Sequence, residues 1–88
     1  MVGWVWVFQS TGEKDIARCD RVVRRRIIDK LAWLAENFED YPPTLLVGEF
    51  KDFFKLRVGD MRIFYQIDWG KRTLIVCYIE RRDTAYKG

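Results

Sequence analysis

The chain of 88 residues contains no histidine, which removes the commonest acid–base and metal-binding side chain of enzymes. Its two cysteines, Cys19 and Cys77, lie far apart in apolar surroundings, so we expect two reduced, buried thiols rather than a disulfide. The sequence has no metal-ligand cluster and no glycine-rich loop that would cradle phosphates. Any chemistry must therefore come from other side chains, and we expect no metal or other cofactor.

The sequence also lacks long apolar runs, and none approaches the roughly 20 residues that a membrane-spanning helix needs. Residues 1–8 have neither the basic leader nor the small-residue cleavage site of a signal peptide, and they alternate like a strand. We therefore expect a cytoplasmic protein with no membrane contact. Hydrophobic residues make up 49% of the chain and aromatic residues 16%, which predicts a single folded domain over residues 1–88.

Basic residues are clustered along the chain. They outnumber acidic residues by 16 to 13, and residues 18–30 alone contain six basic and two acidic side chains. Residues 81–87 contain three basic side chains and one acidic one. A clustered basic surface indicates a polyanion or an acidic partner, although a charged run on one helix is more often a solvated face.

Hydrophobic periodicity predicts two helices and four strands. The strands are expected at about 4–10, 53–58, 61–68 and 73–80, and the helices at about 12–19 and 21–38. Ser10 or Thr11 is expected to cap the first helix and Asp20 the second. Pro42 and Pro43 begin an extended connection. The order β-α-α-β-β-β predicts an α+β fold, with an antiparallel sheet and two helices packed on one face.

Side-chain alternation sorts the last three strands into two faces. The face expected beneath the helices comprises Leu56, Ile63, Ile67, Ile75, Cys77 and Ile79. The opposite face comprises Lys55, Arg57, Arg62, Gln66, Tyr78 and Glu80, with Phe64 and Val76 among them. Cations mixed with aromatic rings are typical of a surface that holds phosphates and stacks bases, although basic residues are also ordinary on a solvated sheet face.

Three segments together resemble the RelE/ParE toxin superfamily. They are Tyr41-Pro42-Pro43 followed by Leu46-Val47-Gly48, the string from Phe54 to Tyr65, and Arg82 to Tyr86. The resemblance covers nearly the whole chain and implies a small twisted antiparallel sheet packed against an α-hairpin, as in RelE. It also implies the toxin of a type II toxin–antitoxin system. RelE-like members are mRNA interferases, endoribonucleases that cut mRNA in the ribosomal A site and so inhibit translation.

The resemblance implies cleavage without a metal, in which the 2′-hydroxyl attacks the adjacent phosphate and the 5′ oxygen leaves. That reaction needs a base, an acid and donors that stabilise the phosphorane charge. Matched to the family, the expected catalytic residues are Lys55, Arg62, Arg82 and Tyr86. The residues expected to bind substrate are Arg57, Arg81, Lys51 and Phe64.

Two departures from the family leave the proton acceptor unidentified. Many members have Gly-His-Arg where this chain has Glu80-Arg81-Arg82, and some have a second lysine where it has Phe53. Two other functions therefore stay open, namely a non-enzymatic ParE-like inhibitor of DNA gyrase and an inactive toxin that only binds its antitoxin. A cognate antitoxin in a hetero-oligomeric complex is the expected partner in each case. An active nuclease would also bind the ribosome and mRNA.

Overall fold

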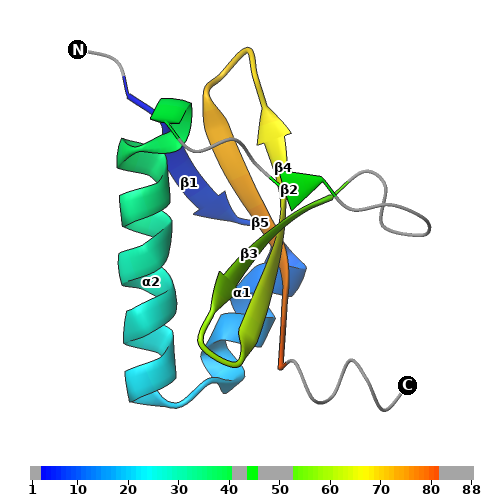
Figure 1. Ribbon diagram of the computed structural model, residues 1–88. Coiled ribbons are helices and arrows are strands. Elements are labelled where there is room, and N and C mark those ends of the chain that lie inside the picture. Colours follow the sequence, from blue (N-terminus) through cyan, green and yellow to red (C-terminus); the bar gives the residue numbers. More distant parts are fainter. Residues whose placement is uncertain (1–2, 41–43, 46–52, 82–88) are drawn as a thin grey trace.

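The computed structural model describes residues 3–40, 44–45 and 53–81, and it confirms the α+β fold (Figure 1). The order of elements agrees with the prediction, with a short strand added in the extended connection. The elements are β1 (Val5–Phe8), α1 (Ser10–Arg18), α2 (Arg21–Glu36), the 3-10 turn η1 (Phe38–Asp40), β2 (Thr44–Leu45), β3 (Phe54–Val58), β4 (Met61–Asp68) and β5 (Thr73–Arg81).

The five strands form one sheet in the order β1-β5-β4-β3-β2. Neighbouring strands are antiparallel except for β1 and β5, which run parallel, so the sheet is mixed rather than wholly antiparallel. The physical reason lies in the connection between them. A tight hairpin can join only antiparallel strands, whereas the chain passes through both helices and the other three strands between β1 and β5.

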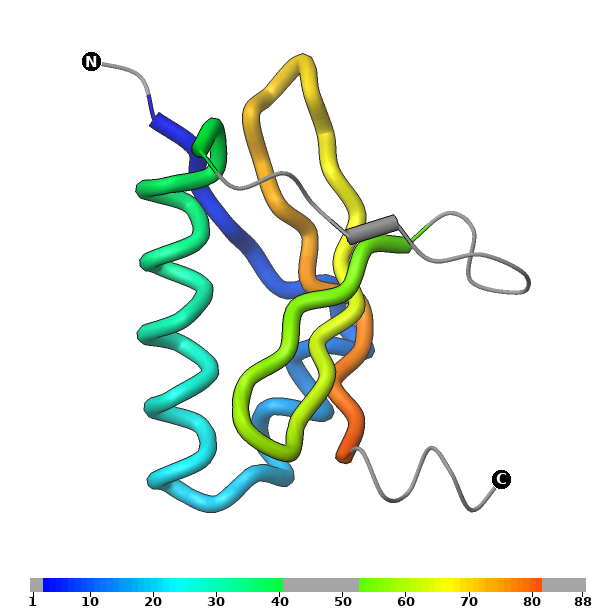
Figure 2. The backbone as a smooth tube through the Cα atoms, in the orientation of Figure 1, coloured from blue at the N-terminus to red at the C-terminus, as the bar shows by residue number. Residues whose placement is uncertain are grey.

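Helix α2 runs alongside the sheet and buries one stripe against it (Figure 2). Its buried residues Ile27, Leu31, Leu34 and Ala35 follow the predicted helical spacing. The Asp20 side chain accepts a hydrogen bond from the Val23 N–H at 2.9 Å, which confirms the predicted N-cap.

The predicted cap of α1 is wrong. Gln9 occupies the N-cap position and makes no side-chain capping bond. The Thr11 hydroxyl instead donates to the Cys77 carbonyl oxygen of β5 at 2.6 Å. The start of α1 is thus fixed by its contact with the sheet rather than by its own cap.

The core lies between the helices and one face of the sheet. One cluster joins Ile16 of α1 and Ile27 and Leu31 of α2 to Ile63, Val76 and Ile79 of the sheet. A second cluster, nearer the end of α2, comprises Leu34, Ala35, Phe38, Tyr65 and Leu74. We call the opposite face of the sheet, turned away from both helices, the outer face.

Strand β5 contains a β-bulge at Cys77. Phe64 pairs with Tyr78 and Tyr65 pairs with Val76, so Cys77 is an additional residue on β5. The bulge overturns part of the predicted alternation, which placed Ile75 and Cys77 beneath the helices and Val76 on the other face. Because one additional residue reverses the side-chain alternation, Val76 is fully buried in the core, and so is Leu74. Ile75 pairs with Gln66, and the Cys77 sulfur lies 3.8 Å from the Gln66 side-chain oxygen, on the outer face.

The start of α1 holds the bulge in place. Strand β1 pairs with β5 only as far as Val76, whose carbonyl oxygen accepts a hydrogen bond from the Gln9 N–H at 2.9 Å. Beyond that point the Asp15 carboxylate accepts from the Ile79 N–H at 2.9 Å. Gly12 packs so closely that a Cβ there would overlap the Val76 carbonyl oxygen. Helix α1 therefore takes over from β1 in satisfying this side of β5.

Candidate functional site

Three charged side chains form a row across the outer face. Arg57 of β3 pairs in register with Arg62 of β4, and Arg62 pairs with Glu80 of β5. Like charges directly opposite one another destabilise a strand pair, and one carboxylate balances only one of the two arginines. This net positive row favours the binding of an anion.

Aromatic side chains form the neighbouring row. Lys55 pairs with Phe64, and Phe64 pairs with Tyr78. The Phe64 ring is only 5% exposed, and the Arg62 guanidinium carbon lies 5.7 Å from its centroid. Tyr78 is 43% exposed and meets the Phe53 ring edge-on, with 5.8 Å between centroids. The outer face thus places a cationic row beside an aromatic row.

The structure brings some of the predicted site residues together and separates others. Lys55, Arg57 and Arg62 lie together on the outer face, and the buried Phe64 of β4 pairs with Lys55. Arg81 instead pairs with Met61, which packs against the helix-side core. The predicted residues Lys51, Arg82 and Tyr86 lie outside the described residues.

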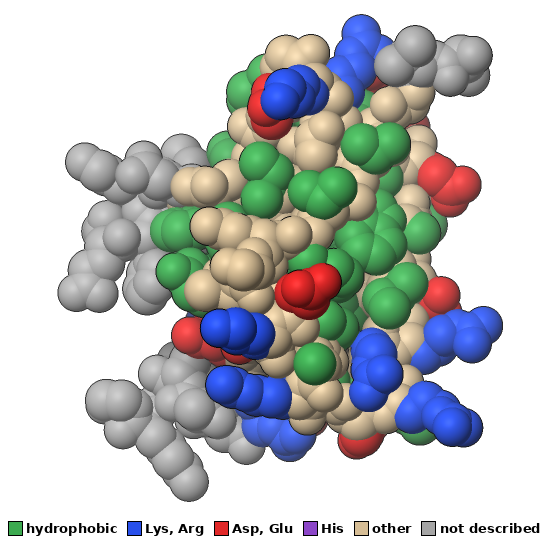
Figure 3. Space-filling model, turned by 180° about the vertical axis from the view of Figure 1, so that it is seen from behind, with side chains coloured by type: hydrophobic (Ala, Val, Ile, Leu, Met, Phe, Trp, Pro, Cys, Tyr) green, Lys and Arg blue, Asp and Glu red, His purple; other side chains and the backbone are tan. Residues whose placement is uncertain are grey.

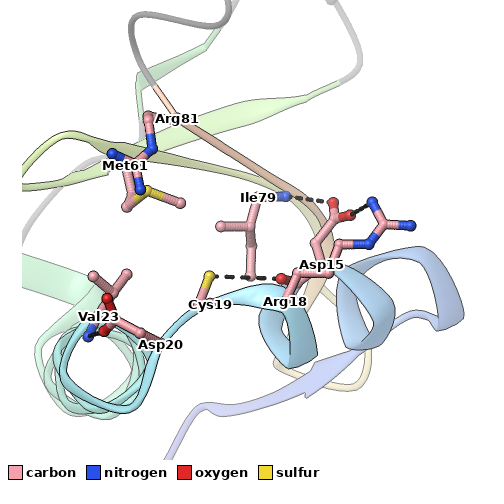
Figure 4. A pocket seen from close by; sticks show the side chains of 8 residues that line it. All are labelled: Asp15, Arg18, Cys19, Asp20, Val23, Met61, Ile79 and Arg81. Carbon is pink, nitrogen blue, oxygen red and sulfur yellow. Dashed lines mark hydrogen bonds and ion pairs between the residues drawn. The ribbon is translucent and has the colours of Figure 1, made fainter.

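Arg81 lines a pocket of about 330 Å³ between the end of the sheet and the α1–α2 junction. Figure 4 shows Arg81 and Met61 on one side of this pocket and Cys19 on the other. The Asp15 carboxylate lies 3.9 Å from the Arg18 guanidinium and already holds the Ile79 N–H. The other carboxylate of this pocket, Asp20, caps α2, so both carboxylates are engaged in structural contacts.

Both cysteines are free thiols, as predicted, but only Cys77 is buried, whereas Cys19 is half-buried. Burial raises the pKa of the Cys19 thiol, and the carboxylates of Asp15 and Asp20 raise it further. Burial also raises the pKa of the Cys77 thiol. Because only the thiolate is a strong nucleophile, both residues are suited to packing rather than catalysis.

Lys and Arg side chains gather at one end of the molecule (Figure 3). It is the end at which Figure 1 places the start of α2 and the turn between β3 and β4. Part of this charge is paired, since Arg25 lies 3.6 Å from Asp29 and the Arg24 guanidinium donates to the Cys19 carbonyl at 3.1 Å. The basic residues at the start of α2 therefore form a solvated helix surface with local partners, unlike the pair Arg57 and Arg62 on the sheet.

The described residues contain no group of three or more histidine, cysteine, aspartate or glutamate side chains placed to hold a metal ion. Within the same ranges, no helix is long and apolar enough to cross a membrane.

Two residues of the outer face have no assigned role in the sequence-based site. Glu80 adjoins Arg62, and Tyr78 adjoins Phe64. Alternation places both on this face, but it gives no measure of exposure and no hint of the bulge. One feature of the sequence does point to an irregular β5. The apolar run from Leu74 to Ile79 is uninterrupted, so it does not alternate and leaves the register of β5 undefined.

The fold of the chain is similar to that of solved RelE toxins. It matches the toxin–antitoxin complex RelBE2 from Mycobacterium tuberculosis with a TM-score of 0.80 and 20% identity, over 92% of this chain and 100% of that one. It matches the isolated E. coli RelE toxin with a TM-score of 0.72 and 18% identity, over 96% of each chain. The archaeal RelE–RelB complex from Pyrococcus horikoshii OT3 gives 0.65 and 18%, over 93% of this chain and 97% of that one.

The chain belongs to the family of ParE toxins of type II toxin–antitoxin systems (parDE), whose family model matches residues 7–86. No curated protein sequence matches it significantly.

Proposed function

We propose that this toxin is a ribosome-dependent mRNA endoribonuclease that acts in the cytoplasm and inhibits translation. The observation that carries the proposal is the pairing of Arg57 with Arg62, beside Lys55, on the outer face of the sheet, where Arg57 is exposed and Arg62 and Lys55 are half-buried. Guanidinium groups bind phosphate oxygens in a bidentate manner. Two of them side by side can stabilise the negative charge that develops on a phosphodiester in the transition state. The RelE-like fold and the family resemblance of these positions support the same function.

The proposed reaction needs only the substrate and protein side chains. The 2′-oxygen forms a bond to the adjacent phosphorus and the bond to the 5′-oxygen breaks, which leaves a 2′,3′-cyclic phosphate and a 5′-hydroxyl. Arg62 and Arg57 stabilise the phosphorane, and Lys55 adds positive charge beside it. Arg82 and Tyr86 are assigned to the site by their match to the family motif.

Glu80 is our candidate for the proton acceptor that the family comparison leaves open. It is exposed and adjoins Arg62 in register, so its carboxylate lies beside the proposed phosphate position. A carboxylate there can take the proton of the attacking hydroxyl. Glu80→Gln should therefore lower the cleavage rate by about 10²-fold or more without changing the melting temperature. Cleavage by Glu80→Gln at the wild-type rate would remove Glu80 from this role.

Mapping mRNA ends on programmed ribosomes tests the proposed function. The wild-type toxin should cut the message within the A site, and Arg62→Ala should reduce the rate by roughly 10²- to 10³-fold, as expected when a transition-state donor is removed. Arg21→Ala serves as the matched control, because Arg21 is an exposed arginine of α2 on the helix side. Absence of cuts by the wild-type toxin, or equal cutting by Arg62→Ala, would contradict the proposal.

Inhibition of DNA gyrase is the second candidate. The matching family model is that of ParE toxins, and Arg81 stands where many RelE-like members have histidine, which favours this function. A supercoiling assay with stoichiometric toxin separates the two proposals. Inhibited supercoiling without mRNA cleavage would support gyrase inhibition, and growth without arrest on expression would support an inactive toxin.

We further propose that a cognate antitoxin binds this toxin in a hetero-oligomeric complex. The structures from M. tuberculosis and P. horikoshii are complexes of RelE-type toxins with RelB antitoxins. This chain exposes apolar side chains on β1, where Val5 is 54% and Val7 46% exposed. Such surface is available for a partner segment that folds on binding. Co-expression with the product of an adjacent antitoxin gene should abolish toxicity and yield a single complex on gel filtration.

A further inference from the structure

Tyr78 is an exposed aromatic ring within a buried stretch of β5. Its neighbours Cys77 and Ile79 are 1% and 6% exposed, whereas Tyr78 is 43% exposed. The ring lies on the outer face, one pairing step from Phe64 and in the row next to Arg62 and Glu80. The ring therefore lies partly in solvent beside the cationic row, where it can contact a ligand on the outer face.

The bulge at Cys77 is what turns Tyr78 toward the outer face. Leu74 and Val76 point into the core, and strict alternation from them would bury Tyr78 beneath the helices and expose Ile79. The additional residue reverses this outcome, so Tyr78 points outward while Ile79 joins the core. Bulges commonly re-aim a side chain next to a functional site.

The re-aimed segment is held on both sides of Tyr78. The Thr11 hydroxyl holds the Cys77 carbonyl at 2.6 Å, and the Asp15 carboxylate holds the Ile79 N–H at 2.9 Å. These two bonds come from α1, on the far side of the sheet from the ring. The orientation of Tyr78 is therefore set by the scaffold and does not depend on a bound ligand.

The surroundings of the ring fit a nucleobase. Phe53 supports it edge-on at 5.8 Å between centroids, which leaves a π-face for another partner. The next same-face row, containing Arg57 and Arg62, lies two residues along the strands, or about 7 Å away. A single nucleotide can therefore reach both a stacking ring and a phosphate-binding arginine.

We propose that Tyr78, supported by Phe53, is a stacking platform for an unpaired base of the RNA whose phosphate binds Arg57 and Arg62. This inference rests on the proposed nuclease function and adds that the substrate is single-stranded at this point, because a paired base would be stacked within its own helix. Stacking of one base on an aromatic side chain is worth about 1–3 kcal/mol, or roughly 5- to 100-fold in affinity. Base–aromatic stacking is tolerant of sequence, so the platform selects for unpaired bases rather than for one codon.

Binding of an RNA probe to Tyr78 variants tests this platform. The probe is a single-stranded oligoribonucleotide with one 2-aminopurine base and a 2′-O-methyl group on every sugar, so that it cannot be cut by 2′-hydroxyl attack. The wild-type toxin should bind it and quench its fluorescence. Tyr78→Phe should keep both properties, and Tyr78→Leu should weaken binding roughly 5- to 100-fold and abolish most of the quenching. Annealing the probe to its complement should weaken binding by the wild-type toxin.

Controls separate stacking from folding and from catalysis. Val22→Ala alters an exposed apolar residue of α2 and should bind as the wild type does. Melting temperatures of the Tyr78 variants should stay within about 2–3 °C of the wild type, because Tyr78 is 43% exposed and belongs to neither core cluster. Wild-type binding by Tyr78→Leu, loss of binding in Tyr78→Phe, or no probe binding by the wild-type toxin would each overturn the proposal.

The two proposals fail separately. If probe binding depends on Tyr78 but the toxin does not cut mRNA on programmed ribosomes, the stacking platform is supported and the nuclease function is rejected. If Tyr78→Leu cuts mRNA on the ribosome with an unchanged KM, the nuclease function is supported and the stacking platform is rejected.

Discussion

The two faces of the sheet differ in what their residues do. On the helix side, Ile63, Leu74 and Val76 are fully buried among residues of α1 and α2, and they determine how the chain packs. On the outer face, Arg57 and Arg62 lie opposite each other, an arrangement that costs stability and gains a place for an anion. The helix side of the sheet therefore contains the core, and the outer face contains the residues of the proposed site.

Strand β5 has residues on both faces, and its bulge changes which of them point into the core. Before Cys77, the even-numbered residues Leu74 and Val76 point into the core, whereas after it the odd-numbered Ile79 does so. This division predicts that changes on the helix side alter stability and that changes on the outer face alter activity alone. The predictions that follow probe this separation from the largest expected effect to the smallest.

Leu31→Ala should destabilise the protein by about 2–5 kcal/mol, because a fully buried leucine leaves a cavity in the core. Val22→Ala, on the same helix but 61% exposed, should change the free energy of unfolding by no more than about 0.5 kcal/mol. Urea unfolding measures both. Equal losses for the two variants would contradict the assignment of the core to this side of α2.

Tyr65 should make the protein less stable at alkaline pH. Burial raises the pKa of Tyr65 from its ordinary value near 10 to about 12, because the fold favours the neutral phenol. The resulting stabilisation is fully present below pH 10 and is lost as the pH rises from 10 to 12, by up to about 2–3 kcal/mol.

The measurement is urea unfolding between pH 9 and pH 12 for the wild type and for Tyr65→Phe, which cannot ionise. The difference between the two proteins isolates the contribution of Tyr65 from that of every other ionisable group. Parallel pH profiles would show that Tyr65 is not buried as described.

Gly12→Ala should destabilise the protein by about 1–3 kcal/mol, because the added Cβ would overlap the Val76 carbonyl oxygen. It should also reduce binding at the outer face, since Thr11 and Asp15 anchor the segment that presents Tyr78. Gly3→Ala is the matched control, because its Cβ would have no neighbour within 4 Å. Thermal unfolding of the two variants at the same melting temperature would argue against the docking of α1 on the bulge.

Arg57→Ala should weaken RNA binding by roughly tenfold, which is the loss of one charged hydrogen-bonding partner, and leave stability unchanged or slightly improved. The improvement is expected because the change removes one charge from a like-charged pair. Fluorescence titration and thermal unfolding on the same samples check both outcomes. A clear loss of stability in Arg57→Ala would break the separation of the two faces.

Much of this structure follows from local patterns in the sequence. The apolar stripe from Ile27 to Ala35 and the Asp20 cap define α2, and Gly59, with φ of 58°, permits the tight turn between β3 and β4. The placement of Lys55, Arg57 and Arg62 on one face follows from alternation in strands that have no interruption.

The remaining features depend on contacts between distant segments. The parallel pairing of β1 with β5, and the bulge held by Thr11 and Asp15, join residues more than 60 positions apart. An apolar run such as Leu74 to Ile79 is compatible with either register, so the side of Tyr78 and Val76 is decided only when α1 packs against the strand.

The chemistry of the cut ends tests the central claim most directly. The wild-type toxin would first be stripped of metal by chelation and then incubated with programmed ribosomes and mRNA. The new RNA ends would then be labelled. The account predicts 5′-hydroxyl ends and 2′,3′-cyclic phosphates at an undiminished rate, and far fewer of both with Arg62→Ala. Ends bearing 5′-phosphate, or cleavage that the chelated toxin recovers only when metal is restored to it, would contradict it.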